Sequence, residues 1–118
     1  MEVIDEIIDY NGYTAYIRKF PSGIMEQCFI IPITTNVITP WKNIYIAGPI
    51  TDKKFPKAFI DTPITLLSII GVNTDAAWTM QIGYTDFDTV PGFFICRGDI
   101  LDTSIEFKVQ VYAIGRWK

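Results

Sequence analysis

An acidic loop and a tryptophan are the parts of this sequence that could contact a ligand. Asp86 and Asp88 flank Phe87 in the polar stretch YTDFDT, and carboxylates at this spacing can bind an ion or a sugar hydroxyl. The loop lacks the glycine and the bidentate glutamate of a calcium loop, so solvated turn residues are the other interpretation. Trp41 follows Pro40 in a predicted loop, where its flat indole could stack on a sugar ring. The candidate ligand contacts are therefore Trp41, Asp86, Phe87 and Asp88.

The composition argues against catalysis. There is no histidine, which removes the commonest general base, the usual metal ligand, and the Ser–His and Cys–His nucleophile pairs. Two cysteines alone do not complete an ordinary zinc site, and no glycine-rich phosphate loop is present. We expect no catalytic residue, no metal and no cofactor, and we predict that the protein is not an enzyme. A small glycan-degrading enzyme, which needs two carboxylates flanking a cleft, is a remote alternative.

Two more tryptophans and two cysteines invite structural interpretations. Trp78 lies on an alternating apolar stretch and is predicted to be in the core. Trp117, beside the end of the sequence, could close the core or a seam between subunits. Cys28 and Cys96 lie in apolar, strand-like contexts, so we expect buried free thiols. A disulfide between them would require neighbouring strands.

Length and composition limit the class of protein. A chain of 118 residues fits one domain. Its 49% hydrophobic and 14% aromatic content suggests that other subunits cover some apolar surface. Four acids and no base occur in the first ten residues, whereas the remainder carries nine acids and ten bases. We therefore expect no export signal. The absence of a basic stripe argues against nucleic acid, and the absence of an apolar run near ~20 residues argues against membrane insertion.

The end of the sequence has the clearest secondary-structure pattern. Apolar residues alternate with polar ones within Thr103–Lys118, at Ile105, Phe107, Val109, Val111 and Ala113. Strict period two places these side chains on one face of a β-strand. Because free chain ends fray, we expect this strand to be locked into a sheet.

The other predicted strands follow from turn signals. Tyr13–Phe20 and Ile24–Ile31 predict a hairpin, with Gly23 supplying the positive φ of the turn. Ile64–Ile70 is apolar on both faces and predicts a central strand covered on both sides. We also predict shorter strands at Asn43–Ala47, Ala76–Tyr84 and Gly92–Arg97. Residues 71–75 are predicted to form a turn, and Pro32–Pro40 an irregular edge segment.

Together these segments predict an all-β fold. We expect a single β-sandwich or jelly-roll-like domain of about seven or eight antiparallel strands over residues 11–118. Residues 1–10 carry apolar residues at helical spacing but are too few for a stable isolated helix. We expect this segment to be a helical or extended lead-in to the domain.

Two passages resemble a known family. Residues 16–28, YIRKFPSGIMEQC, resemble the hairpin "YRKW-x-SG-x-AECW", and the ending VYAIGRWK is similar to the closing "AIGRWK". Between them, Phe55-Pro56, Phe59 and Thr62-Pro63 resemble that family's "FP…F…P" segment. The family comprises C-terminal, distal-tip domains of tail-fibre or minor structural proteins from tailed bacteriophages and prophages. The chain departs from it where Phe20 and Phe29 replace tryptophans and where Gln27 separates Glu26 from Cys28.

The resemblance implies a homotrimeric fibre tip that binds a host cell-surface glycan or protein. It implies a location in the virion, at the tip of a tail fibre, and synthesis in the bacterial cytoplasm. Residues 1–10 would then connect a fibre shaft to the domain. A purely structural trimerisation or capping module of a fibre or baseplate is the alternative. The resemblance also supplies a structural signature, which consists of Arg18, Lys19, Gly23, Cys28, Gly115, Arg116 and Trp117.

Overall fold

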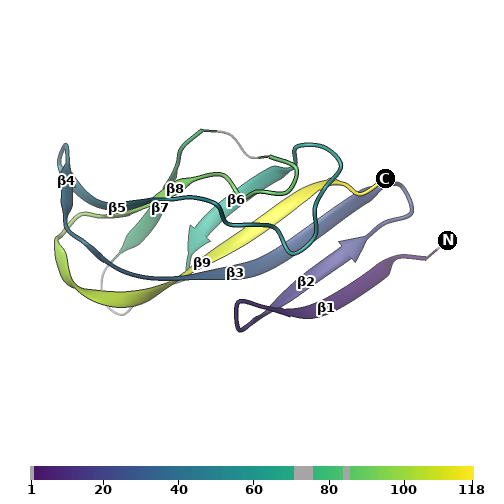
Figure 1. The fold of residues 1–118 in the computed structure, drawn as a ribbon, viewed down its shortest axis with the longest axis horizontal. Helices are drawn as coiled ribbons and strands as arrows, with labels where there is room; N and C mark the ends of the chain where they lie inside the picture. The colour runs from purple at the N-terminus through teal and green to yellow at the C-terminus, as the bar shows by residue number, and fades with distance from the viewer. Residues whose placement is uncertain (1, 71–75, 84–85) are drawn as a thin grey trace.

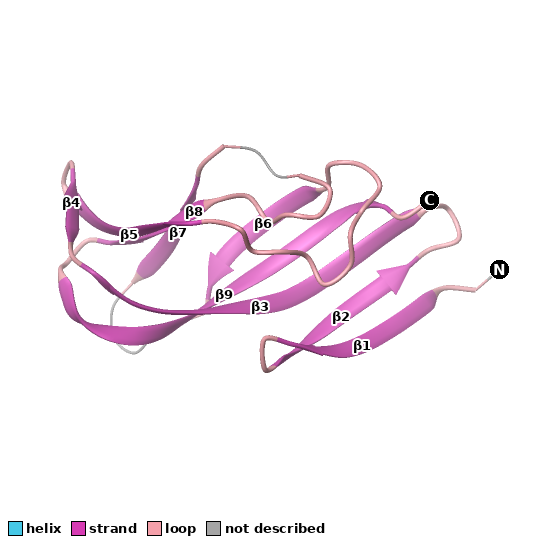
Figure 2. Ribbon diagram, viewed as in Figure 1, coloured by secondary structure: helices cyan, strands magenta, loops and turns pink. Residues whose placement is uncertain are grey.

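The chain folds into two antiparallel β-sheets packed face to face. The computed structural model describes residues 2–70, 76–83 and 86–118, and within these ranges there is no helix (Figures 1 and 2). The nine strands are β1 (Ile4–Tyr10), β2 (Tyr13–Lys19), β3 (Ile24–Val37), β4 (Thr39–Trp41), β5 (Ile44–Ile50), β6 (Ile64–Ile69), β7 (Ala77–Gln81), β8 (Phe93–Arg97) and β9 (Leu101–Arg116). One sheet has the order β1-β2-β3-β9-β6 and the other β4-β5-β8-β7. The predicted all-β sandwich is confirmed.

The terminal strand is locked into the five-stranded sheet, as expected from the sequence. β9 pairs with β3 along one edge and with β6 along the other. Its inward side chains, which include Phe107, Val109 and Ala113, are fully buried. They pack against Phe93 and Ile95 of β8 in the same hydrophobic core. Period two in the sequence therefore identified the buried face of this strand.

The predicted hairpin forms, but its second strand is longer than expected. β3 continues through Pro32 to Val37, so the predicted irregular edge at Pro32–Pro40 is wrong for most of its length. β2 pairs with β3 only as far as Cys28, and beyond that point β3 is paired with β9 alone. Proline is tolerated there because one side of the strand needs no ladder donor.

Two apolar strands lie differently from the sequence prediction. β6 is an edge strand with one uncovered face, so the predicted central strand covered on both sides is wrong. In β7, Trp78 points outward and is exposed, whereas the neighbouring Ala77 and Thr79 are more buried. The predicted core position of Trp78 is therefore also wrong. The predicted turn at 71–75 and the end of the predicted strand at residue 84 lie outside the described residues.

The first ten residues belong largely to a strand. β1 is extended, one of the two conformations expected, and pairs with β2 over seven residue pairs. Its inward side chains Ile8 and Tyr10 pack against the core. That these residues lead in from a fibre shaft stays a prediction. The described residues contain no helix that is long and apolar enough to span a membrane.

Candidate functional site

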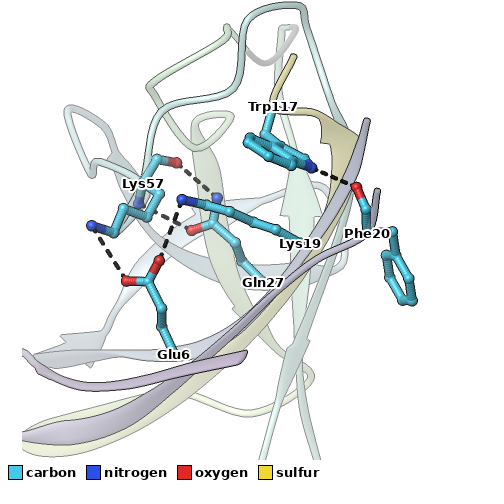
Figure 3. Close-up of polar contacts among 6 residues, drawn as sticks. All are labelled: Glu6, Lys19, Phe20, Gln27, Lys57 and Trp117. Atoms are coloured by element: carbon cyan, nitrogen blue, oxygen red, sulfur yellow. Dashed lines mark hydrogen bonds and ion pairs between the residues drawn. The ribbon is translucent and has the colours of Figure 1, made fainter. Parts of the chain in front are cut away.

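Two segments that are far apart in the sequence meet at the end of the molecule where both chain termini lie (Figure 1). The Trp117 indole Nε1 donates a hydrogen bond of 2.9 Å to the Phe20 carbonyl, as Figure 3 shows. The Trp117 backbone N–H donates to the Gly23 carbonyl, also at 2.9 Å. The turn of the β2–β3 hairpin is thereby fastened to the end of β9. We call this arrangement the terminal lock.

Two glycines of the structural signature allow close approach in the terminal lock. Gly23 has φ +101°, and a Cβ there would lie 2.9 Å from the Lys118 backbone oxygen. A Cβ at Gly115 would lie 2.9 Å from the Phe59 ring and 3.0 Å from the Pro63 Cβ. These separations are shorter than ordinary carbon contacts. Each glycine therefore makes room for a different neighbouring segment.

Arg116 joins the same end of the molecule to the loop before β6. Its guanidinium donates to the Asp61 carboxylate at 3.1 Å and to the Lys118 backbone oxygen at 3.1 Å. The Ile60 backbone N–H donates to the Arg116 carbonyl at 3.0 Å. The three passages that carry the family resemblance are thus in contact with one another.

A network of charged and polar groups ties β1 to this region (Figure 3). Glu6 lies between Lys19 at 3.3 Å and Lys57 at 3.5 Å, and these ammonium groups, Lys19 first, lower the pKa of its carboxyl group. The buried Gln27 side chain donates to the Lys57 carbonyl at 2.7 Å and accepts from the Lys57 N–H at 3.1 Å. Lys19 also lies over the Trp117 ring, 5.4 Å from its centroid. These contacts therefore link β1, the end of β2, the loop around Lys57 and Trp117 to one another.

The remaining signature residues, Arg18 and Cys28, lie on the outer face of the five-stranded sheet. The Arg18 guanidinium contacts the two Asp5 carboxylate oxygens at 2.6 and 3.1 Å, and this hydrogen bonding lowers the pKa of Asp5. Cys28 is exposed, so its predicted burial is wrong, whereas Cys96 is buried as expected. Both thiols are free. Partial burial, and then the charge of Glu26, raise the pKa of Cys28.

The acidic loop lies against the segment that follows β5. The Phe87 and Asp88 carbonyls accept hydrogen bonds from the backbone N–H groups of Phe59 and Phe55, at 2.8 and 3.0 Å. Lys54 Nζ lies 3.8 Å from the Asp88 carboxylate. Phe87 keeps an exposed ring, and the Asp86 carboxylate accepts from the Phe87 N–H at 2.8 Å. These contacts suit a structured turn that presents one aromatic ring.

Trp41 is separated from the acidic loop. It ends β4, which lies at the opposite end of the long axis from the two chain termini (Figure 1). Its ring is exposed, and Lys42 Nζ lies 4.9 Å from its centroid. The four predicted ligand contacts are therefore not brought into one site, and Trp41 stands apart from Asp86, Phe87 and Asp88.

A feature that the sequence did not reveal is an apolar row across the five-stranded sheet. Five residues stand directly opposite one another on successive strands and face outward. We call them the outer row, and they are Ile7, Tyr16, Cys28, Tyr112 and Leu66. The Tyr112 hydroxyl donates a hydrogen bond to the Glu26 carboxylate. Each member occurs in a separate strand, so finding the row requires both the strand order and the register.

The described residues offer little equipment for catalysis. Within residues 2–70, 76–83 and 86–118, no three His, Cys, Asp or Glu side chains are grouped to hold a metal ion. The carboxylates that are held in place, such as Glu6 and Asp5, lie in ion pairs with Lys19 and Arg18. These ion pairs hold β1 against β2.

Comparison with known proteins identifies a fold relative. No protein-family model matches the chain, and no curated protein matches its sequence. The chain is similar to the solved structure of an N-truncated R1-type pyocin tail fibre, with a TM-score of 0.55 and 14% identity. The match covers 98% of this chain and 86% of that chain. At this identity the likeness establishes the shared fold.

Proposed function

We propose that this chain is a tail-fibre module of a bacteriophage or phage-tail-like particle. The observation that carries the proposal is the fold likeness to a pyocin tail fibre over 98% of the chain. The resemblance of the hairpin and of the AIGRWK ending to phage tail-fibre tips supports it independently. The contacts among Trp117, Phe20 and Gly23 give those sequence passages a shared structural role.

Within the fibre, we propose a homotrimeric tip that attaches the particle to its host. The chain termini lie at one end of the long axis, and β4 with Trp41 lies at the other (Figure 1). A fibre that joins this domain through its N-terminal end would present the β4 end to the cell surface. Three copies would give avidity to sites that are weak singly. The receptor is a cell-surface glycan or protein, and the chain is a component of the virion.

Binding to host cells tests the attachment role. Fluorescently labelled protein is incubated with bacteria of candidate host strains, and unlabelled protein is added as competitor. Saturable binding that the unlabelled protein displaces supports attachment. Binding to none of the strains that the parent particle infects would contradict it, and would favour a trimerisation or capping module. Sustained release of sugars from host glycan, lost in the D86N/D88N double variant, would instead indicate the enzymatic alternative.

A further inference from the structure

We propose that three copies of this chain associate through the outer face of the five-stranded sheet, with Cys28 nearest the three-fold axis. The inference rests on the trimer proposed above and assigns that trimer a contact surface. The occupant of the face is thus a second and a third copy of the same chain. Each copy contributes the outer row, in which Cys28 is the middle residue.

The outer row exposes several large apolar side chains on neighbouring strands. Ile7 is 70% exposed, Tyr16 56% and Leu66 63%. Ile64, two residues before Leu66 on β6, is 71% exposed. Contiguous apolar patches of this kind on soluble proteins mark contact surfaces. Because Ile7 and Leu66 at the two ends of the row are aliphatic, the face suits a protein partner better than a sugar.

The size of the five-stranded sheet sets the scale of the contact that this face can make. Five strands spaced about 4.8 Å apart, seven residues long at about 3.3 Å per residue, give a projected area of roughly 450 Å², from the strand order and the length of β1. Projecting side chains raise the accessible area above this value. A standard interface buries about 800 Å² per partner, so this part of the sheet supplies about half of that area before its side chains are counted.

On the side of the outer row where Arg18 lies, charged groups are already paired within the chain. Arg18 is bound in bidentate fashion by Asp5 at 2.6 and 3.1 Å, and Glu26 accepts a hydrogen bond from Tyr112. Strand register places Arg18 between Asp5 and Glu26. Burial of a charge is costly unless it is paired. This part of the face carries charges of both signs in contact with one another, so a second copy can cover it without strong repulsion.

Two hollows of different size on this face suit a closed ring of three copies. A hollow of about 260 Å³ is lined by Asp5, Ile7, Tyr16, Arg18, Glu26 and Cys28, among others. A second, of about 570 Å³, lies towards β6 and also borders Tyr16 and Cys28, together with Leu66 and Tyr112. A three-fold ring requires two different patches that complement each other. In the proposed ring, the β1 side of one copy, where Ile7 projects, faces the larger hollow on the β6 side of the next.

Mutations within the outer row and outside it test this assignment. Light scattering gives the mass of the wild-type chain and of L66E, I7E and I100E at the same micromolar concentration. Ile100, 54% exposed in the turn before β9, is the matched control for Leu66. We expect wild type and I100E at three times the 13.4 kDa chain mass, and L66E and I7E at the monomer mass. Circular dichroism spectra check that all four proteins remain folded.

Thiol reactivity reports directly on the centre of the face. Maleimide is applied at about pH 8.5, where even a thiol of raised pKa reacts. We expect modification of Cys28 in the wild type to be at least about tenfold slower than in L66E, because an interface shields it. Cys96, buried inside the sandwich, should remain unmodified in both until urea unfolds the chain.

The outcomes separate the contact surface from the trimer itself. A trimer whose Cys28 reacts freely, and which L66E and I7E leave intact, would overturn the proposed surface while the trimer stands. Dimers would overturn the three-fold arrangement. A monomeric wild type would overturn the trimer of the proposed function and this inference with it.

Discussion

The indole of Trp117 donates a 2.9 Å hydrogen bond to the backbone carbonyl of Phe20, 97 residues earlier in the chain. The same carbonyl closes the hairpin turn by accepting from the Gly23 N–H at 3.0 Å. The C-terminal tryptophan and the β2–β3 turn therefore depend on one another. The alternatives for Trp117 were closure of the core or of a subunit seam, and within the chain it packs against the core.

Loss of the indole donor should weaken the terminal lock. Trp117→Phe keeps an aromatic ring but removes the N–H, so the Phe20 carbonyl loses one of its partners. We expect the free energy of unfolding to fall by about 1 kcal/mol, the net worth of a typical hydrogen bond. Urea denaturation followed by circular dichroism measures this change. Trp78→Phe, at an exposed position on β7, is the control, and an equal loss there would contradict the assigned role of Trp117.

Gly115 should tolerate no side chain, although its backbone conformation is ordinary. A Cβ there would lie 2.9 Å from the Phe59 ring and 3.0 Å from Pro63. Gly115→Ala should therefore cost about 1–3 kcal/mol through overpacking, measured as a lower urea midpoint. At Gly98 a Cβ would meet no described atom within 4 Å, so Gly98→Ala should stay within about 0.5 kcal/mol of wild type. Equal stability of the two variants would mean that the loop before β6 yields easily.

Tyr112 should be the tyrosine that loses its proton last among those with a raised pKa. The hydrogen bond to Glu26, with burial and the negative charge of that carboxylate, raises its pKa from 10.0 to about 12. The folded state thus favours the neutral phenol. Its contribution to stability is fully present below pH 10 and is lost as the pH rises towards 12.

Ultraviolet titration of tyrosinate absorbance checks this expectation. Tyr112→Phe should remove the component that titrates near pH 12, and Glu26→Gln should move that component down towards pH 10. Tyr16→Phe, on the same face of the sheet, is the control and should leave it in place. Persistence of the late component in Tyr112→Phe would assign it to another tyrosine.

The sequence predicted those parts of the fold in which one face is apolar and the other polar. Phe107, Val109 and Val111 alternate with charged or polar residues, and β9 followed the prediction. In β6, Leu66 and Leu67 are both apolar, so the pattern could not tell a covered face from a bare one. In β7 the small residues Ala77 and Thr79 face inward while Trp78 faces outward, which reverses the expectation from size and hydropathy.

The terminal lock and the outer row were less accessible to sequence reasoning. The signature residues from Arg18 to Trp117 were identified by resemblance alone, because contacts such as Arg116–Asp61 join segments 55 residues apart. The outer row depends on strand order and on register, which place Ile7 and Leu66 at opposite ends of one line. Neither quantity is encoded in local periodicity. Among the four predicted ligand contacts, Asp86, Phe87 and Asp88 belong to one loop, whereas Trp41 was chosen only for its aromatic ring. Nothing in the sequence therefore required Trp41 to lie beside the other three.

Among the predicted ligand contacts, Trp41 is the one at the end of the molecule that we propose faces the cell surface. It is 40% exposed in β4, at the end of the molecule opposite the chain termini (Figure 1). Trp41→Ala should therefore reduce binding to host cells at least about tenfold, as truncation of a central aromatic contact does. Its urea midpoint should remain close to that of wild type, because its exposed ring contributes little to the core.

Trp78→Ala is the matched control for this last experiment, since Trp78 is 42% exposed on β7 of the same sheet. Binding of both variants to host cells is measured by flow cytometry with labelled protein. If Trp41→Ala binds as well as wild type while Asp86→Asn/Asp88→Asn loses binding, the contact surface lies at the acidic loop instead. Equal losses in Trp41→Ala and Trp78→Ala would place it across the outer face of the four-stranded sheet.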